Sequence, residues 1–199
     1  MLDLVGQIEL TGRRVFVRAD LDVPLGERQQ ILDDLPIRNA LPTVELALKK
    51  GARVVLASHL GRPDRKHSLE PAAARLAELL DREVRLADEC VGDGVRKLIM
   101  EQRAGELVML ENLFFHPGEE ANDPEFAKAL AALCEIYVDD AFSCAHRTWA
   151  SNVGMVAHVA GPRVAGLQLS KELEGRGLET LAGLPAVEAL LKHEQSSTT

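Results

Sequence analysis

The sequence is poor in several kinds of residue, and each shortage excludes a class of protein. Only three of 199 residues are cysteines, Cys90, Cys134 and Cys144, and no two of them have metal-binding spacing. This scattered, odd number predicts free thiols in a reducing compartment rather than a disulfide framework. No apolar run approaches the roughly 20 residues that cross a bilayer. The first residues lack the charged start and long apolar core of a signal peptide. We therefore expect a soluble, cytoplasmic protein with no membrane contact.

Basic residues and glycine-rich nucleotide motifs are also lacking. The net charge of −8 argues against a nucleic-acid partner. There is no Gly-x-x-x-x-Gly-Lys-Ser/Thr loop, and no Gly-x-Gly-x-x-Gly follows the first predicted strand. Glu111, His116 and Glu119 have a loosely metal-like spacing, but no fourth ligand lies nearby. We interpret them as part of a solvated turn and expect no metal site.

Apolar runs that alternate with amphipathic segments are abundant. Strands are predicted at 14–20, 53–57, 83–87, 106–110 and 136–139, and helices at 37–50, 69–80, 93–103 and 123–134. Strands that alternate with helices imply right-handed crossovers and a mainly parallel sheet. The prediction is a three-layer (α/β/α), Rossmann-like α/β fold.

Polar side chains follow four of these strands, where each strand ends. They are Arg18, Asp20 and Asp22; His59 and Arg62; Glu111, Asn112 and His116; and Asp139, Asp140, His146 and Arg147. Parallel strands place such ends along one edge of the sheet, where ligands of open α/β sheets bind. Convergence of His59, Arg62 and Arg147 would create a cationic pocket for a phosphate or carboxylate. The alternative is coincidence, because 27% of the chain is charged.

Other candidates near these ends have plainer interpretations. Cys144 and His146 could form a nucleophile pair, but no orienting group is evident, which favours an inert thiol. The Asp139–Asp140 pair could serve acid–base chemistry, yet a strand-end turn with one solvated carboxylate is the preferred interpretation. Phe114 and Trp149 are interpreted as packing residues.

The strand-end segments resemble the phosphoglycerate kinase family, and the match extends over roughly the first 175 residues. Its motifs are Val17-Arg-Ala-Asp-Leu-Asp-Val-Pro24, Ala40-Leu-Pro-Thr43, Ser58-His-Leu-Gly-Arg-Pro63, Leu110-Glu-Asn-Leu-Phe-Phe-His-Pro-Gly-Glu119, Asn122-Asp-Pro124, Asp140-Ala-Phe142 and Ala145-His-Arg147. The resemblance is to the N-terminal, 3-phosphoglycerate-binding domain of a two-domain enzyme that transfers a phosphoryl group between ATP–Mg and 3-phosphoglycerate. The family's second domain holds the nucleotide, so no cofactor is expected on this chain alone.

The resemblance also implies roles for single residues. Asp20 would contact the substrate hydroxyl, His59 and Arg62 would hold the substrate, and Arg147 would hold its phosphate. Asp22, Leu60 and Gly61 would complete this substrate-binding set.

Several family positions are altered in this chain. The family has arginines where this chain has Pro36 and Phe114, and asparagine where it has Asp22. In the family, the arginine at the position of Pro36 is the main catalytic cation. This chain lacks it, so no catalytic residue is assigned. Each charge-assisted contact contributes roughly 1.5–3 kcal/mol. Two lost arginines are therefore expected to weaken phosphoglycerate binding by about 10²–10⁴-fold.

The family's glycine-rich nucleotide segments are absent, whereas the stretch from Leu178 to Lys192 resembles the family's C-terminal end. The expected organisation is a domain at 1–174, a segment at 175–193 that packs back on it, and a disordered tail at 194–199. A glycine-containing joint is expected at 174–177. The resemblance implies a monomeric, substrate-binding half that is inactive alone. The alternatives are a pseudoenzyme or small-ligand binding module with a remodelled pocket, a structural remnant, and complementation by a separate nucleotide domain.

Overall fold

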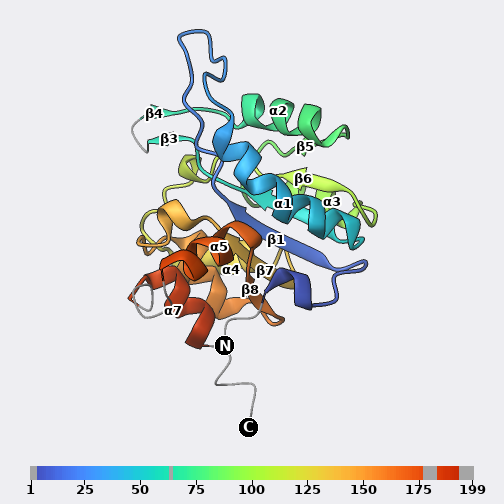
Figure 1. Cartoon of the computed structure of the whole chain (residues 1–199), viewed down its shortest axis with the longest axis vertical. Helices are drawn as coiled ribbons and strands as arrows, with labels where there is room; N and C mark the ends of the chain where they lie inside the picture. Colours follow the sequence, from blue (N-terminus) through green and yellow to red (C-terminus); the bar gives the residue numbers. More distant parts are fainter. Residues whose placement is uncertain (1–3, 63–64, 177–182, 193–199) are drawn as a thin grey trace.

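A computed structural model describes residues 4–62, 65–176 and 183–192 of the chain (Figure 1). Its centre is a six-stranded sheet with the strand order β5-β6-β2-β1-β7-β8. The strands are β1 (Arg14–Ala19), β2 (Arg53–Ala57), β5 (Arg85–Leu86), β6 (Leu107–Met109), β7 (Ile136–Asp140) and β8 (Arg163–Ala165). Every pairing in this sheet is parallel. The predicted three-layer α/β fold is confirmed.

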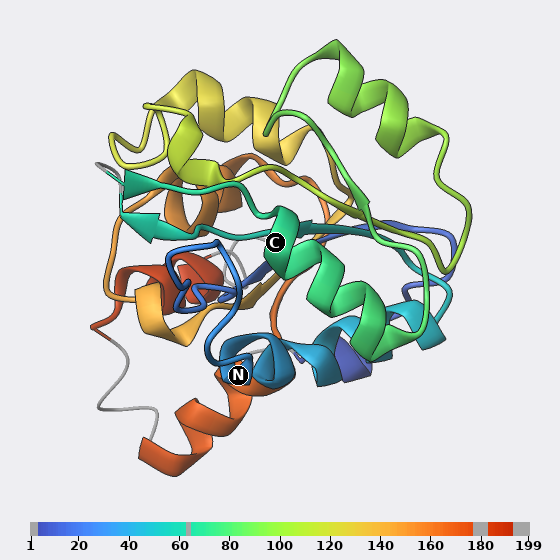
Figure 2. The same ribbon diagram turned by 90° about the horizontal axis from the view of Figure 1, so that it is seen from above.

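Helices cover both faces of the sheet. They are α1 (Leu35–Lys49), α2 (Glu70–Leu80), α3 (Asp93–Met100), α4 (Pro124–Ala131), α5 (Leu167–Arg176) and α7 (Pro185–Lys192). Figure 2 shows α1 and α2 on one side of the sheet and α3 and α4 on the other. Among the described residues, no helix is long and apolar enough to span a membrane.

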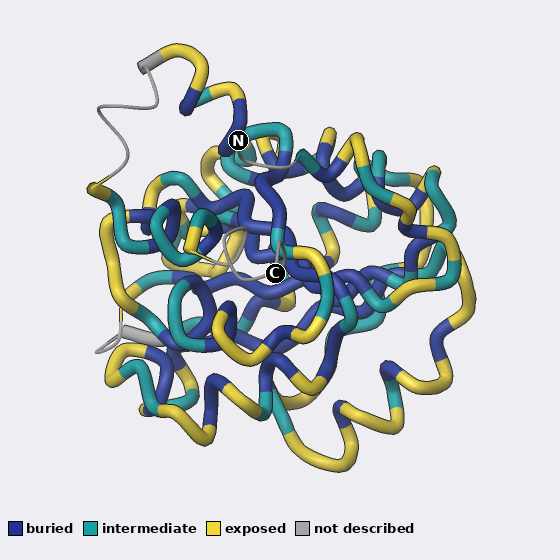
Figure 3. The backbone as a smooth tube through the Cα atoms, turned by 90° about the horizontal axis from the view of Figure 1, so that it is seen from below, coloured by how far each residue is buried: buried dark blue, intermediate teal, exposed yellow. Residues whose placement is uncertain are grey.

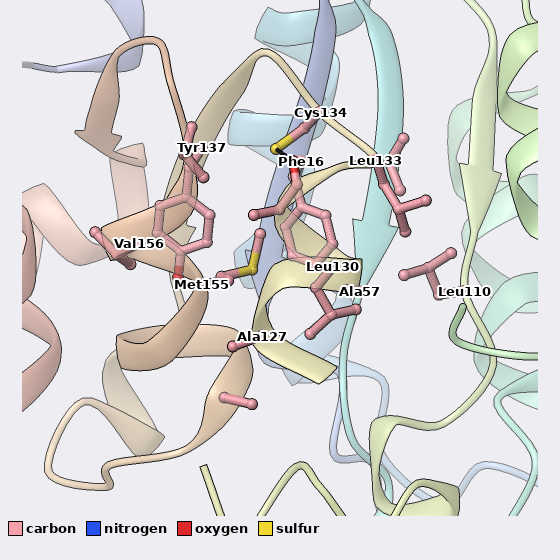
Figure 4. Packing of buried hydrophobic residues seen from close by; sticks show 14 of the residues in the cluster. Phe16, Ala57, Leu110, Ala127, Leu130, Leu133, Cys134, Tyr137, Met155 and Val156 are labelled. Atoms are coloured by element: carbon pink, nitrogen blue, oxygen red, sulfur yellow. Dashed lines mark hydrogen bonds between the residues drawn. The ribbon is translucent and has the colours of Figure 1, made fainter. Parts of the chain in front are cut away.

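Two hydrophobic clusters, one on each face, hold these layers together. Val15 and Val17 of β1 belong to the cluster beneath α1 and α2, whereas Phe16 belongs to the opposite cluster. Phe16 and Tyr137 stack with ring centroids 6.0 Å apart, and Leu130 of α4 and Met155 pack in the same cluster (Figure 4). The central strands are buried along their length (Figure 3). Burial on both faces explains why these strands read as continuous apolar runs.

Some elements differ from the sequence prediction. Strand β8 was not predicted, and neither was the antiparallel ribbon of β3 (Gly61–Arg62) and β4 (Arg65–Lys66). Short 3-10 turns occur at Val5–Gln7, Leu113–Phe115, Phe142–Cys144 and Met155–His158, and Ala150–Gly154 forms a π-turn. These elements are two to five residues long, too short for a periodic apolar pattern to reveal them.

The C-terminal helix α7 packs on the domain. The Ala186 N–H donates to the carbonyl of Ala145 at 3.1 Å, and Val187 and Leu190 are buried in the cluster that contains Phe16. The joint expected at 174–177 is instead helical as far as Arg176. Residues 177–182, and the tail expected at 194–199, lie outside the described residues.

Candidate functional site

The four strands with polar ends are the four central strands of the sheet. In the parallel register, Arg18 pairs with Ala57 of β2 on one side and with Asp139 of β7 on the other. The chain therefore leaves β2 at Ser58 beside the point where it leaves β1 at Asp20. The prediction that these ends share one edge of the sheet is confirmed.

Arg18 and His59 form a buried pair at this edge. Arg18 is fully buried, and its Nη2 lies 3.0 Å from Nδ1 of His59. Because a guanidinium can only donate, Nδ1 is the acceptor, and the neutral ring carries its proton on Nε2. Burial, followed by the charge of Arg18, lowers the pKa of His59 to about 3. His59 therefore offers a neutral N–H donor, and the expectation that it adds positive charge to the pocket is wrong.

Ser151 links Arg18 to a buried carboxylate. Arg18 Nε donates to Ser151 Oγ at 2.8 Å, and both the hydroxyl and the N–H of Ser151 donate to the carboxylate of Glu119. Burial raises the pKa of Glu119, and the charge of Arg18 opposes that rise. Burial alone would lower the pKa of Arg18, but its acidic neighbours, Cys144 and Glu119 first, raise it. Arg18 thus stays charged, and its side chain links the end of β1 to His59 and Ser151.

Sequence reasoning missed this network. Glu119 was assigned to a solvated turn and is fully buried, which corrects that interpretation. Ser151 gave no signal, because it is placed by the π-turn at Ala150–Gly154, which has no periodic pattern in sequence.

The two aspartates that end β7 are also buried, and the predicted solvated carboxylate is wrong. Asp139 accepts hydrogen bonds from the Tyr137 hydroxyl at 3.3 Å and the Ala141 N–H at 3.0 Å, and burial raises its pKa. Asp140 Oδ1 accepts the N–H groups of Gln168 and Leu169 at 2.8 and 3.1 Å. Burial raises the pKa of Asp140 to about 7. Asp140 thus accepts hydrogen bonds from the first turn of α5.

An aromatic cluster covers His59. The rings of Phe114 and Trp149 lie 4.9 and 5.2 Å from the His59 ring, and they meet each other edge to face at 5.2 Å and 84°. The interpretation of Phe114 and Trp149 as packing residues is confirmed. The guanidinium carbon of the exposed Arg147 lies 5.8 Å from the centre of the Trp149 ring. His59 and Arg147 therefore both lie close to the Trp149 indole.

The turn that precedes Arg62 has its own set of contacts. Asp22 Oδ1 accepts the Gly61 N–H at 2.8 Å, and Asp20 Oδ1 accepts the Asp22 N–H at 3.1 Å. Gly61 has a φ of +80°, a conformation that favours glycine, and the preceding Leu60 anchors the turn because it is fully buried. Desolvation, together with the charge of Asp20, raises the pKa of Asp22.

The Arg62 side chain is exposed. It lines a cavity of about 360 Å³ together with Asp22 and His67. Neither His59 nor Arg147 is among the described residues that line this cavity, so the three side chains that were predicted to converge do not line one pocket. Pro36, at the start of α1, lines a further cavity that includes Asp20.

The remaining strand-end residues have structural roles. Glu111 accepts hydrogen bonds from the Ser68 hydroxyl and the Leu69 N–H at 2.7 and 2.8 Å, where α2 begins. Asn112 bonds to the backbone of Leu60 and His67. Glu111, which was interpreted as part of a solvated turn, is buried instead. No group of His, Cys, Asp or Glu that could hold a metal occurs among the described residues.

The predicted inert thiol is supported by burial. Cys144 is 2% exposed, and its Sγ donates to the Ala141 carbonyl at 3.4 Å. Desolvation raises the pKa of Cys144 to about 11, so the thiolate is scarce at neutral pH. His146 is exposed on the surface.

Comparison with known proteins agrees with the fold. Residues 5–181 match the family described as phosphoglycerate kinase. Phosphoglycerate kinase of Anaeromyxobacter sp. (strain Fw109-5) is 50% identical over 182 residues, which cover 88% of this chain and 46% of that protein. The cytosolic phosphoglycerate kinase of Triticum aestivum is 50% identical over 173 residues, which cover 85% of this chain and 43% of that protein.

Solved structures of phosphoglycerate kinases have a similar fold. Phosphoglycerate kinase from Coxiella burnetii superposes with a TM-score of 0.77 at 36% identity, covering 87% of this chain and 44% of that one. The enzyme from Pyrococcus horikoshii OT3 gives a TM-score of 0.80 at 31% identity, with the same coverage of 87% and 44%. This chain spans about half the length of the curated relatives it matches.

Proposed function

The chain belongs to the phosphoglycerate kinase family, and from that premise we propose that it is the half that binds 3-phosphoglycerate. In the whole reaction, ATP and 3-phosphoglycerate would give ADP and 1,3-bisphosphoglycerate. The observation that supports the proposal is that Arg62 and Arg147 are both exposed on segments that follow strand ends at one edge of the sheet, those of β2 and β7. Two guanidinium groups at a shared edge suit an acidic, phosphorylated ligand.

Each side chain has a proposed role that follows from its chemistry. Arg147 would hold the phosphate and Arg62 the rest of the acidic ligand. Asp20 would accept the ligand hydroxyl, and His59 would donate its Nε2–H. Asp22, with Leu60 and Gly61, would hold the Arg62 turn, because the Asp22 carboxylate already accepts the Gly61 N–H.

Binding would be weaker than in relatives that keep both family arginines. Pro36 supplies no charge, and Phe114 is 4% exposed within the aromatic cluster. The Phe114 and Trp149 rings carry no charge, so they would not replace a missing arginine. The expected loss is the 10²–10⁴-fold estimated above from the two missing contacts.

We propose that these 199 residues do not catalyse phosphoryl transfer on their own. Phosphoryl transfer depends on positioning both substrates and on neutralising the transferred group, and the glycine-rich nucleotide motifs are not in this sequence. We propose a monomer in the cytoplasm that uses neither nucleic acid nor membrane as a partner and binds no cofactor by itself. A coupled assay with ATP, Mg²⁺ and 3-phosphoglycerate should show no turnover, and measurable turnover would refute this part.

The binding proposal is tested by thermal unfolding with and without 3-phosphoglycerate. The ligand should raise the melting temperature of the wild type and of Arg13→Ala, since Arg13 is exposed at the amino end of β1, opposite the site. It should raise that of Arg62→Ala and Arg147→Ala much less. An equal shift in all four proteins would contradict the assignment of the two arginines.

A non-catalytic binding module with a remodelled pocket is a second candidate. The observation that favours it is the edge-to-face pair of Phe114 and Trp149 over His59, which makes this part of the edge apolar. Calorimetry with 3-phosphoglycerate and with uncharged analogues such as glycerol separates the two candidates. Tighter binding of the uncharged analogue would favour the module, and silence for every ligand would eliminate both.

A further inference from the structure

Trp149, the only tryptophan in the chain, packs against two buried rings. Its ring centroid lies 5.2 Å from both the His59 and the Phe114 ring, at angles of 71° and 84°. His59 and Phe114 are themselves buried, and their rings lie 4.9 Å apart. Edge-to-face contacts at such distances are favourable and depend on ring orientation. The two buried rings therefore fix the orientation of an indole that is only partly buried.

The backbone around Trp149 is held by one buried side chain. Asn152 is 1% exposed, and its Oδ1 accepts the Trp149 N–H at 2.9 Å. Its Nδ2 donates to the carbonyls of Cys144 and Arg147 at 2.9 and 3.1 Å. The Trp149 carbonyl in turn accepts the N–H of Val153 at 3.0 Å. The main chain of Arg147 and that of Trp149 are therefore fixed by the same amide group.

The Arg147 side chain, by contrast, is exposed, and its guanidinium carbon lies over the Trp149 ring at 5.8 Å from the ring centre. Among the residues that the structure describes, Arg147 forms no ion pair with a carboxylate. A cation within about 6 Å of a tryptophan ring centre is attracted to the ring face. An arginine side chain loses much rotamer freedom when a ligand immobilises it. An indole that already restrains the guanidinium reduces that loss.

We propose that Trp149 is a positioning residue, which holds the guanidinium of Arg147 in place for the phosphate group of the ligand. This inference rests on the proposed binding of 3-phosphoglycerate and deepens it, because it adds a residue that acts through Arg147. The indole would be the rigid part of the arrangement and the guanidinium the part that it restrains. The alternative is that Trp149 only packs over His59 and has no influence on the ligand.

The expected effect follows from the strength of an exposed cation–π contact, which changes an equilibrium by about two- to fivefold. Trp149→Leu should bind 3-phosphoglycerate more weakly than the wild type by that factor, as measured by NMR titration. Trp149→Phe keeps an aromatic ring and should lose less. Phe115→Leu is the control, because it removes a 39% exposed ring from the turn that follows Phe114. A loss in Trp149→Leu no larger than that in Phe115→Leu would overturn the proposal.

A double-variant cycle tests whether Trp149 acts through Arg147. Arg147→Gln removes the guanidinium that lies over the indole. In that background Trp149→Leu should cause no further loss of affinity for 3-phosphoglycerate, because the contact that it removes is already absent. The same two- to fivefold loss in both backgrounds would mean that the indole acts on the ligand or on His59 directly, and would overturn the proposal.

A measurement without ligand separates this proposal from phosphoglycerate binding. Ring currents shift protons above an aromatic face upfield, so the side-chain protons of Arg147 should resonate upfield in the wild type and move downfield in Trp149→Leu. Unchanged resonances in Trp149→Leu would overturn the positioning role alone, even if 3-phosphoglycerate binds. A ring-dependent shift in a wild type that does not bind 3-phosphoglycerate would overturn the proposed function, and the positioning role with it.

Discussion

Replacing Arg18 with methionine tests whether the buried charge network holds the strand ends. Methionine preserves much of the side-chain length but removes the donors to His59 and Ser151. Glu119 would stay fully buried and keep its Ser151 donors, but it would lose the favourable charge of Arg18. Arg18 and Glu119 are linked through Ser151, and leaving a buried polar group unsatisfied costs about 1–3 kcal/mol, so a loss of that order is expected.

The loss should depend on pH, with a sign that follows from the shifted groups. Burial already raises the pKa of Glu119 and Asp139, and the charge of Arg18 opposes both shifts. Without Arg18 both pKa values rise further, so the folded state binds more protons than the unfolded state over a wider pH range. Stability then falls more steeply as pH rises above the ordinary carboxyl pKa. Arg18→Met should therefore be less destabilised at pH 5 than at pH 8.

Urea unfolding followed by circular dichroism measures this at both pH values. The double variant Arg18→Met/Glu119→Gln should be less destabilised than the sum of the single variants, by roughly 0.5–3 kcal/mol for groups in one network. Arg13→Met, at an exposed pair with Glu135, should change stability by at most about 1 kcal/mol. A loss for Arg18→Met that is independent of pH and additive with Glu119→Gln would refute the reasoning.

Three further outcomes follow from buried groups. The pKa of Asp140 in the folded state is about 7, so its contribution to stability falls as pH rises from about 4 to 7. Relative to the wild type, Asp140→Asn should therefore gain up to about 4 kcal/mol of unfolding free energy over that interval, measured by urea titration. Cys90, Cys134 and Cys144 are buried with raised pKa values, and a thiol reagent at pH 8 should label them only after urea is added; labelling of the folded protein would contradict their burial. Leu190→Ala should destabilise the fold by about 2–5 kcal/mol, because Leu190 of α7 is 1% exposed, and a neutral result would show that α7 adds little.

The arrangement of the site edge was predictable from sequence because it depends on topology. Parallel strands joined by helices must place their carboxyl ends together, so Arg18, His59 and Asp139 could be assigned to one edge without coordinates. The helix and strand positions followed from apolar runs that the two-faced burial of the sheet requires.

The charge states of the site could not be predicted in the same way. Sequence reasoning counted His59 as a cation and Glu119 as solvated, because neither burial nor the hydrogen bond of Ser151 is visible in a local pattern. The hydrogen bond from Arg18 to Ser151 joins residues 133 positions apart in the chain. The π-turn at Ala150–Gly154 positions Ser151 for this bond. The cavity lined by Asp20 and Pro36 likewise depends on how α1 and α5 meet, which no single motif encodes.

The most direct test of the account is a calorimetric titration of 3-phosphoglycerate into Arg62→Ala/Arg147→Ala and into Arg13→Ala. Each lost charge-assisted contact should weaken binding by about 10–100-fold. The account predicts wild-type affinity for Arg13→Ala and no detectable heat for the double variant. Wild-type affinity in the double variant would contradict the claim that these two strand-edge arginines hold an acidic ligand.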